Sequence, residues 1–447
     1  MSGAPSKDHR RSGDAPSQAG AASSASRDPS TSLASLRPAN TLLSAGALNV
    51  ALRGATLASK FVLALLIARY LTPADYGLYG LVNVTVALSL FVLGFDFYVF
   101  ASRDMLARPE ADWPAMIRDQ LVFHGLFYLV ALPALLGVFA LHLLPWAMLG
   151  WFYALVVLEH LAQEAYRLLI TLSRPVAANA VLFLRSGAWI YAVGAFMWRA
   201  STARTLTWVW AGWAVGVAAS ILLAVWFVRG LRWSTALTQR VDWTWIRAGI
   251  GRSGVFLFAS FAMRGIEAVD RYFLEAYRGA ADVGVYSFYY SFANVVYVFT
   301  FAAVVASFHP VLLKSGALPA LGGHLKRFAL WLGACVVGVA LCVAVGFRFV
   351  LLLVGKPAYA GHLLAFYVLL GSACLNTASL IPHYALYARN RDAALVISAC
   401  LALVCAVGAH VTLVPTWGIL GSAVATAVGM GVLLVTKSGL ALVGRAG

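Results

Sequence analysis

The chain has 447 residues, of which 62% are hydrophobic and 11% charged, and its mean hydropathy is +0.82. An ordinary soluble domain carries about 25% charged residues, so this composition excludes a soluble globular fold. The formal net charge is +16. Because the Lys and Arg residues cluster between alternate apolar runs rather than along one soluble face, this charge does not indicate a nucleic-acid partner.

The first 40 residues, rich in Ser, Ala, Gly and Pro, predict a disordered cytoplasmic tail. They lack the apolar core of a signal peptide, and Arg10-Arg11 precedes the first apolar run by ~30 residues, too far for a twin-arginine export signal. The five cysteines show no CxxC spacing and fall inside apolar runs. We therefore predict packing roles for them, and no disulfide, metal site or cofactor.

The apolar runs are long enough to cross a bilayer, where unpaired backbone amides are too costly, so we expect α-helices. Hydropathy predicts about twelve spans. They are placed at residues 44–70, 77–100, 121–144, 148–170, 178–198, 206–228, 250–276, 284–308, 328–353, 363–387, 393–413 and 418–440. The basic, Trp-rich connection 229–248 would separate an N-lobe (41–228, spans 1–6) from a C-lobe (249–447, spans 7–12), as in transporters built from two related halves.

The distribution of positive charge predicts the orientation. With a cytoplasmic amino terminus, about 20 Lys and Arg residues fall in inward segments and only about four, namely Arg199, Arg204, Arg278 and Lys356, in outward loops. Both termini are therefore expected to be cytoplasmic.

A short motif recurs after the first span of each half. Residues 73–79 read PADYGLY and residues 280–286 read AADVGVY, so that Ala, Asp, Gly and Tyr recur in register. The same place in the span order indicates a parallel internal repeat, and chance recurrence is the alternative. In each copy the Asp can cap the following helix, and the Gly permits a tight helix start.

Further motifs extend this pattern over about half of the chain. The first half carries IARYLTP (67–73), DYGLY (75–79) and Arg103, then EAYR (164–167) and SRP (173–175); the second half carries DRYFL (270–274), VGVYS (283–287) and His309-Pro310. In their order and spacing these motifs resemble the polysaccharide-transporter, or O-antigen flippase, branch of the multidrug/oligosaccharidyl-lipid/polysaccharide exporter superfamily.

The resemblance implies an all-α membrane protein with about 12 transmembrane helices in two six-helix lobes around a central cavity that opens alternately to each side. The implied cargo is a glycan linked by a pyrophosphate to a polyprenyl lipid, moved from the cytoplasmic to the periplasmic leaflet of the inner membrane during polysaccharide or lipopolysaccharide biosynthesis. A glycan polymerase and other assembly proteins are the expected protein partners.

Ionisable side chains near span centres are the strongest signal for a site. They are Arg53, Lys60, Glu159, Glu164, Arg185, Arg264 and Glu267. Leaving them in lipid would cost on the order of 20 kcal/mol, so we expect them to face each other or water. Helical spacing places polar residues on one face of four spans. These faces are Asn49, Arg53, Thr56 and Lys60; Thr85, Ser89 and Asp96; Arg264, Glu267 and Arg271; and Tyr286, Tyr290, Asn294 and Tyr297.

Such faces predict a hydrated cavity whose basic residues suit a pyrophosphate, because Arg offers paired donors and Lys a compact charge. The predicted substrate contacts are Arg53, Lys60, Arg185, Arg264, Arg271, Tyr286, Tyr290 and Asn294. Two alternatives stay open: an internal ion-pair ladder for Arg264, Glu267 and Arg271, and plain packing for the tyrosines.

Buried carboxylates and a histidine are candidates for ion coupling, since burial and neighbouring charges decide their protonation. The candidates are Glu159, His160, Glu164, Glu267, Asp270 and Asp96. The alternative is a structural salt bridge or a hydrogen-bonded clamp between helices.

Two other functions are compatible with a polytopic membrane protein. A multidrug extrusion antiporter shares the architecture, but cationic cargo favours acidic and aromatic walls, whereas here basic residues line the first span of each half. An O-antigen polymerase or an integral glycosyltransferase usually needs a sizeable aqueous loop, and the outward loops here are short. The sequence shows no nucleotide-phosphate loop, DxD motif or Ser/His/Asp constellation, so a transporter is favoured over an enzyme.

Overall fold

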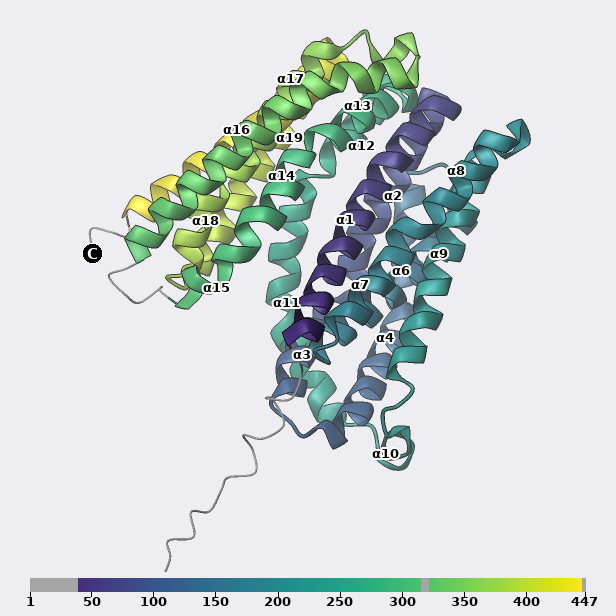
Figure 1. The fold of residues 1–447 in the computed structure, drawn as a ribbon, viewed down its shortest axis with the longest axis vertical. Helices are drawn as coiled ribbons and strands as arrows, with labels where there is room; N and C mark the ends of the chain where they lie inside the picture. The colour runs from purple at the N-terminus through teal and green to yellow at the C-terminus, as the bar shows by residue number, and fades with distance from the viewer. Residues whose placement is uncertain (1–38, 315–320, 444–447) are drawn as a thin grey trace, which may run out of the picture. The chain divides into compact units, whose positions relative to one another are not determined.

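The computed structural model describes residues 39–314 and 321–443, which are helical almost throughout (Figure 1). The first elements are α1 (Ala39–Tyr70), α2 (Pro73–Gly94), α3 (Phe97–Leu106), α4 (Trp113–Leu135), α5 (Gly137–Ala140), α6 (Leu149–Thr171), α7 (Pro175–Phe183), the π-helical turn η4 (Leu184–Ala188), α8 (Trp189–Arg199) and α9 (Leu206–Val228). They continue with α10 (Trp233–Thr238), α11 (Trp243–Ile266), α12 (Val269–Arg278), α13 (Ala280–Ala293), α14 (Val295–Thr300), the π-helical turn η6 (Phe301–Val305), α15 (Ala306–Lys314), α16 (Leu321–Val354), α17 (Leu363–Ala378), α18 (Leu380–Tyr387) and α19 (Asp392–Val443). Short 3₁₀ turns join several of them.

The helices confirm an all-α membrane protein. In the described ranges, nine segments are long and apolar enough to cross a membrane. The last of these, α19, is two helices joined at Gly418, whose φ of 55° and ψ of −127° interrupt it, in agreement with separate spans predicted there. Helix α6 has 23 residues, about 35 Å of helix, but polar residues such as Glu159 lower its hydropathy. These elements are compatible with the predicted twelve spans.

The outer surface of the helices suits a lipid environment. Large apolar side chains such as Leu129, Leu222 and Leu352 are between 72% and 78% exposed. The predicted tail, residues 1–40, lies outside the described residues except for Ala39 and Asn40, which already belong to α1. By contact, Leu48–Gly447 forms one unit, and its division into two lobes stays a prediction.

Helix breaks interrupt several predicted spans, and the break in the second span corrects the polar face expected there. Helix α2 ends at Gly94, and Phe95 and Asp96 adopt left-handed φ values of 50° and 47°. Asp96 therefore does not continue one helical face with Thr85 and Ser89. The seventh span is likewise divided, since α11 ends at Ile266 and α12 begins at Val269.

The repeated motif lies where α2 packs along α13. A Cβ atom on Gly77 would overlap the carbonyl oxygen of Ala280, and a Cβ atom on Gly284 would overlap that of Pro73. The two glycines thus permit close approach of the helices, rather than the tight helix starts that the sequence suggested.

The capping predicted for the two aspartates differs between the copies. Asp75 accepts a hydrogen bond from the backbone N–H of Thr72 (3.1 Å), and the Thr72 hydroxyl accepts one from the N–H of Asp75, a complete capping box. Helix α13 begins after Gly279, at φ 88°, without a side-chain cap, so the expected cap is confirmed only in the first copy.

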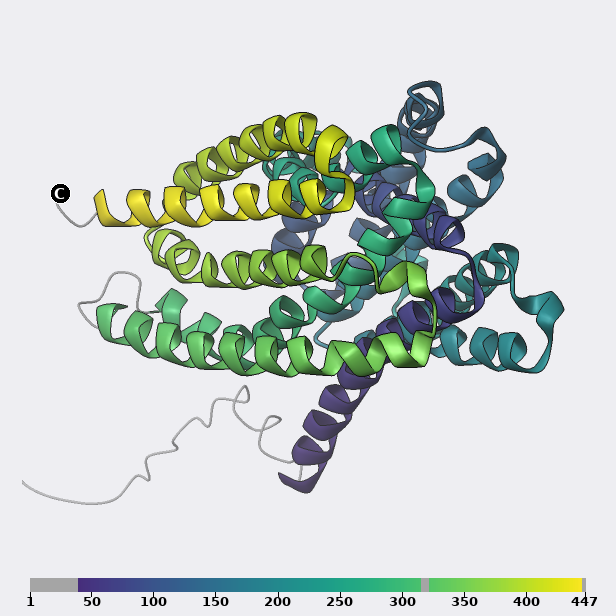
Figure 2. The same cartoon turned by 90° about the horizontal axis from the view of Figure 1, so that it is seen from above.

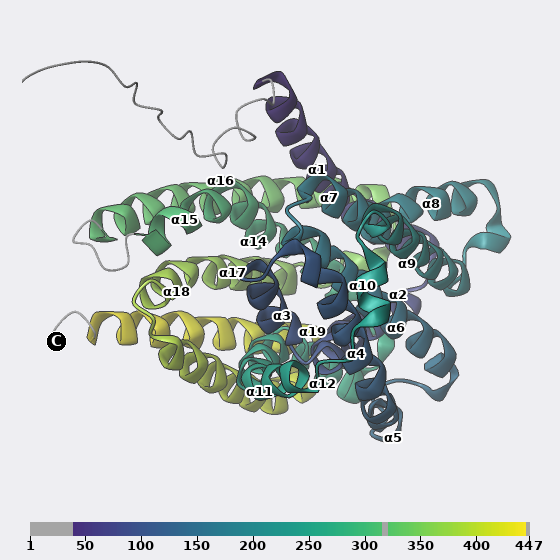
Figure 3. The same cartoon turned by 90° about the horizontal axis from the view of Figure 1, so that it is seen from below.

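Aromatic residues hold α11 against α3 and α4. Phe97, Phe123 and Trp245 belong to one buried cluster, and the indole N–H of Trp245 donates to the carboxylate of Asp104 (2.7 Å). Figure 3, the view from below, shows α3, α4 and α11. Elsewhere α17 packs along α19, in the green and yellow region of Figure 2.

Candidate functional site

A cavity of about 790 Å³ lies between helices of the first half of the chain and helices α11 to α14. Its walls come from α1, α2, α6, α7, η4, α8, α9, from the α11–α12 junction and from α13 and α14. Its charged lining residues are Lys60, Glu159, Arg167, Arg185, Arg264, Glu267 and Arg271. Its aromatic lining residues are Phe61, Tyr76, Tyr79, Phe91, Tyr166, Trp189, Trp213 and Tyr290.

A buried clamp holds one side of the cavity. The guanidinium of Arg185, in the π-helical turn η4, forms an ion pair with the carboxylate of Glu159 on α6, with Nε to Oε2 at 2.5 Å. The other carboxylate oxygen accepts the indole N–H of Trp213 on α9 (2.5 Å). Both oxygens of Glu159 are therefore satisfied, as burial requires. The π-helical turn adds a residue to the helix at this point, a feature common at functional sites.

Lys60 differs from the other basic lining residues. It is solvent-exposed on α1, and within residues 39–314 and 321–443 no carboxylate lies within ion-pair distance of its ammonium group. Its charge is therefore available to a ligand in the cavity.

The broken α11–α12 segment supplies a second set of charges. Arg264 forms an ion pair with Glu267 (2.6 Å), and the guanidinium of Arg271 donates to the backbone carbonyl of Glu267 (3.0 Å) and to the carboxylate of Asp270 (3.0 Å). Of the ion-pair ladder expected as an alternative, the structure forms only the Arg264–Glu267 pair, because Arg271 reaches the backbone carbonyl of Glu267 and pairs with Asp270 instead. Arg264, Glu267 and Arg271 all line the cavity. The Arg271 guanidinium lies 4.4 Å from the centre of the Tyr290 ring, a cation–π contact.

The structure brings six of the eight predicted substrate contacts to this cavity. They are Lys60, Arg185, Arg264, Arg271, Tyr290 and Asn294. Arg53 lies outside its lining and donates to the side-chain amide oxygen of Asn179 on α7 (3.2 Å). Tyr286 is fully buried, and its hydroxyl contacts Asp270 (2.7 Å) and Thr426 (2.9 Å).

The ion-coupling candidates are spread over several places. Glu159 and Glu267 line the cavity, whereas His160, Glu164, Asp270 and Asp96 do not. The fully buried His160 contacts the hydroxyl of Tyr128 (2.6 Å), and Glu164 pairs with Arg167 (2.6 Å). Ion coupling through any of them stays a prediction.

Several lining residues were not among the predicted contacts. Trp213 and Tyr79 lie in apolar runs, where an aromatic residue is indistinguishable from a packing residue by sequence. Arg167 does carry a signal, since its guanidinium lies on the same arc of α6 as Glu164, with which it pairs.

The sequence and the fold were compared with those of known proteins. No family model matches the chain, and no curated protein sequence matches it. Its fold is that of an all-α, multi-pass membrane protein. The chain is similar to a structure described as the inward-facing conformation of a multidrug resistance MATE family transporter of the MOP superfamily, with a TM-score of 0.69, 13% identity and coverage of 88% of this chain and 94% of that one.

A second similar structure is the lipid II flippase MurJ in an inward closed conformation, with a TM-score of 0.61, 11% identity and coverage of 87% of this chain and 86% of that one. At these identities the similarity concerns the fold.

Proposed function

We propose that the protein is a flippase that moves a polyprenyl-pyrophosphate-linked oligosaccharide from the cytoplasmic to the periplasmic leaflet of the inner membrane, by alternating access. In this proposal both termini are cytoplasmic, the protein is not an enzyme, and the lipid-linked glycan serves the assembly of a polysaccharide or lipopolysaccharide. The fold similarity to a lipid II flippase and to a MATE transporter supports movement of a substrate across a membrane.

The positive charge of the cavity is the observation that favours an anionic, pyrophosphate-linked cargo. Five basic and two acidic side chains line it, and Arg167 and Arg271 pair with Glu164 and Asp270 outside the lining, so that within the described residues only Lys60 among the lining cations has no carboxylate partner. The two acids, Glu159 and Glu267, already pair with Arg185 and Arg264. The exposed ammonium of Lys60 is then the primary contact for a pyrophosphate, which stays anionic at neutral pH and accepts charge-assisted hydrogen bonds.

The remaining lining suits a glycan. Tyr79 stacks on Trp210 with ring centres 5.6 Å apart, and the lining also includes Tyr290 on α13 and Asn294 between α13 and α14. Aromatic faces and amide groups bind sugars through stacking and hydrogen bonds, and such contacts tolerate different sugar sequences.

Contacts at the α1–α2 turn provide a gate for alternating access. The guanidinium of Arg69 donates to the carbonyl of Leu353 (2.7 Å), and the ammonium of Lys356 donates to that of Leu71. Together with the crossing of α2 and α13, they join the two repeats at one end of the cavity. Opening this end requires those contacts to break while the cavity closes elsewhere.

Reconstitution tests the proposal directly. The purified full chain is placed in vesicles that contain polyprenyl-pyrophosphoryl-N-acetylglucosamine, and the fraction of sugar accessible to an external glycosyltransferase is followed with time. We expect faster equilibration between leaflets than in protein-free vesicles. Equal rates with and without protein, in vesicles where the protein is folded, would refute the proposal.

The same vesicles test the main alternative, a multidrug extrusion antiporter. Of the two similar structures, the MATE transporter has the higher TM-score. A cationic dye is loaded in place of the lipid. Because the cavity carries excess positive charge, we expect no protein-dependent movement of the dye. Dye transport without lipid movement would favour the alternative.

A further inference from the structure

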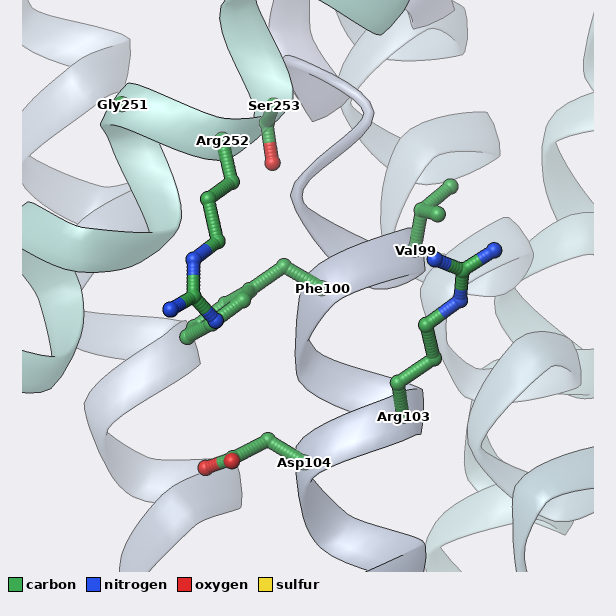
Figure 4. A pocket seen from close by; sticks show the side chains of 7 residues that line it. All are labelled: Val99, Phe100, Arg103, Asp104, Gly251, Arg252 and Ser253. Carbon is green, nitrogen blue, oxygen red and sulfur yellow. The ribbon is translucent and has the colours of Figure 1, made fainter.

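A second cavity, of about 450 Å³, lies between α3 and α11 and shares no lining residue with the central one. It is lined by Val99, Phe100, Arg103, Asp104, Gly251, Arg252 and Ser253 (Figure 4). Arg252 and Arg264, which borders the central cavity, are twelve positions apart on α11, or about 18 Å of helix. The two cavities are therefore distinct sites.

The charged lining of this second cavity is unbalanced. Both Arg103 and Arg252 are exposed, and neither forms an ion pair within the described parts of the chain. Arg252 lies over the ring of Phe100, 5.4 Å from its centre, so an aromatic face orients its guanidinium. The carboxylate of Asp104 does not neutralise them, because it pairs with Arg108 (3.0 Å) and accepts the indole N–H of Trp245.

An unpartnered hydroxyl gives an independent sign of a ligand. Ser253 is 1% exposed, and its hydroxyl has no hydrogen-bond partner within the described residues. A buried polar group without a partner costs free energy, so a bound acceptor would stabilise it. In Figure 4 Ser253 and Arg252 come from α11, and Arg103 comes from α3 on the other side of the cavity.

We infer that this cavity binds a phosphate group attached to an apolar chain. The two guanidiniums offer planar, paired donors to phosphate oxygens, and the Ser253 hydroxyl offers a further donor. Val99 and Phe100 give the same cavity an apolar wall suited to the chain next to the phosphate. This site is independent of the cargo proposed for the central cavity.

Native mass spectrometry of the purified full chain tests the site with four probes. They are a polyprenyl monophosphate, phosphatidylglycerol, a diacylglycerol with the same acyl chains but no phosphate, and inorganic phosphate as a competitor. We expect the double variant Arg103→Gln/Arg252→Gln to bind both phosphate lipids at least about tenfold more weakly, and Ser253→Ala to bind them several-fold more weakly.

Arg229→Gln is the matched control. Arg229 is also an exposed arginine over an aromatic ring, that of Trp226 (5.0 Å), but it lines neither cavity. Its loss should leave lipid binding unchanged. Should the double variant fail to fold, the two single arginine variants and Ser253→Ala carry the test.

Tight binding of both phosphate lipids, with weak binding of the diacylglycerol and little competition by inorganic phosphate, supports the inference, whereas inorganic phosphate that binds as tightly as the phosphate lipids would show a site for soluble phosphate and overturn the role of the apolar chain. Wild-type affinity in the double variant, or diacylglycerol binding as tight as that of the phosphate lipids, would overturn the inference. Loss of binding in Lys60→Gln alone would place the lipid in the central cavity, which overturns this inference and leaves the proposed flippase intact.

Discussion

Gly77 and Gly284 occupy equivalent positions in the two repeats and lie against each other where α2 crosses α13. A Cβ atom on Gly77 would lie 3.1 Å from the backbone nitrogen of Gly284, and one on Gly284 would lie 2.9 Å from that of Gly77. The relation is reciprocal, as expected for a parallel repeat folded about a local two-fold axis. In a membrane, such small-residue crossings let helix backbones pack closely.

The first prediction concerns this crossing. Gly284→Ala should lower the free energy of unfolding by about 1–3 kcal/mol, because the added methyl group forces the α2 and α13 backbones apart. Thermal unfolding in detergent measures the change. Gly125→Ala on α4 is the control, since an added Cβ there meets nothing within 4 Å and alanine favours helix. Equal stability of the two variants would show that α2 and α13 do not cross at these glycines.

The second prediction concerns the Glu159 clamp. Glu159→Gln leaves the buried guanidinium of Arg185 without its ion pair, and we expect a loss of about 3 kcal/mol in the free energy of unfolding. The control is Glu267→Gln, which breaks the more exposed pair with Arg264, whose side chain is 53% exposed, and should cost at most about 1 kcal/mol. A larger loss for Glu267→Gln than for Glu159→Gln would contradict this ranking.

The third prediction is a pH dependence at the start of α11. The Asp242 carboxylate accepts hydrogen bonds from the Thr244 hydroxyl and from the backbone N–H of Trp245, which lower its pKa below the ordinary value of 3.8. A lowered folded-state pKa contributes stability that is present above pH 3.8 and is lost as the pH falls through the folded-state pKa.

Asp242→Ala should therefore cost about 1 kcal/mol at pH 7, the usual value of a helix cap, and less at the lowest pH at which the protein stays folded. Thermal unfolding of the variant and the wild type at both pH values gives the difference. Asp242→Asn caps without titrating and should show little pH dependence. A cost for Asp242→Ala that is the same at both pH values would contradict the prediction.

Composition and hydropathy were sufficient to predict the helical membrane fold, because long apolar runs have no other stable arrangement in a bilayer. The breaks at Phe95–Asp96 and at Glu267–Ala268 were not predictable from periodicity, which assumes a continuous helix. Left-handed φ at Phe95, an aromatic residue, is set by tertiary packing that the sequence pattern does not reveal.

The site was predictable where burial of charge is costly. Lys60 and Arg264 line the cavity as expected because a cation near a span centre must face water or a partner. Arg53 instead finds a partner, since its guanidinium donates to the side-chain amide of Asn179. No local sequence pattern shows whether a basic residue will line the cavity or pair with another side chain. Trp213, which completes the clamp on Glu159, lies in an apolar run and carries no polar signal.

The fourth prediction tests the proposed role of the cavity's charge, with two basic residues of α1 that are seven positions apart. Lys60→Gln removes the exposed, unpaired cation from the central cavity, and Arg53→Gln removes a cation that lies outside its lining. The measurement is the rate at which polyprenyl-pyrophosphoryl-N-acetylglucosamine equilibrates between leaflets of vesicles that contain each purified variant. We expect Lys60→Gln to lower that rate at least about tenfold, because one charge-assisted hydrogen bond to the cargo is lost. Arg53→Gln should change the rate by less than about twofold. Wild-type transport by Lys60→Gln would contradict the central claim that the positive charge of this cavity binds the cargo.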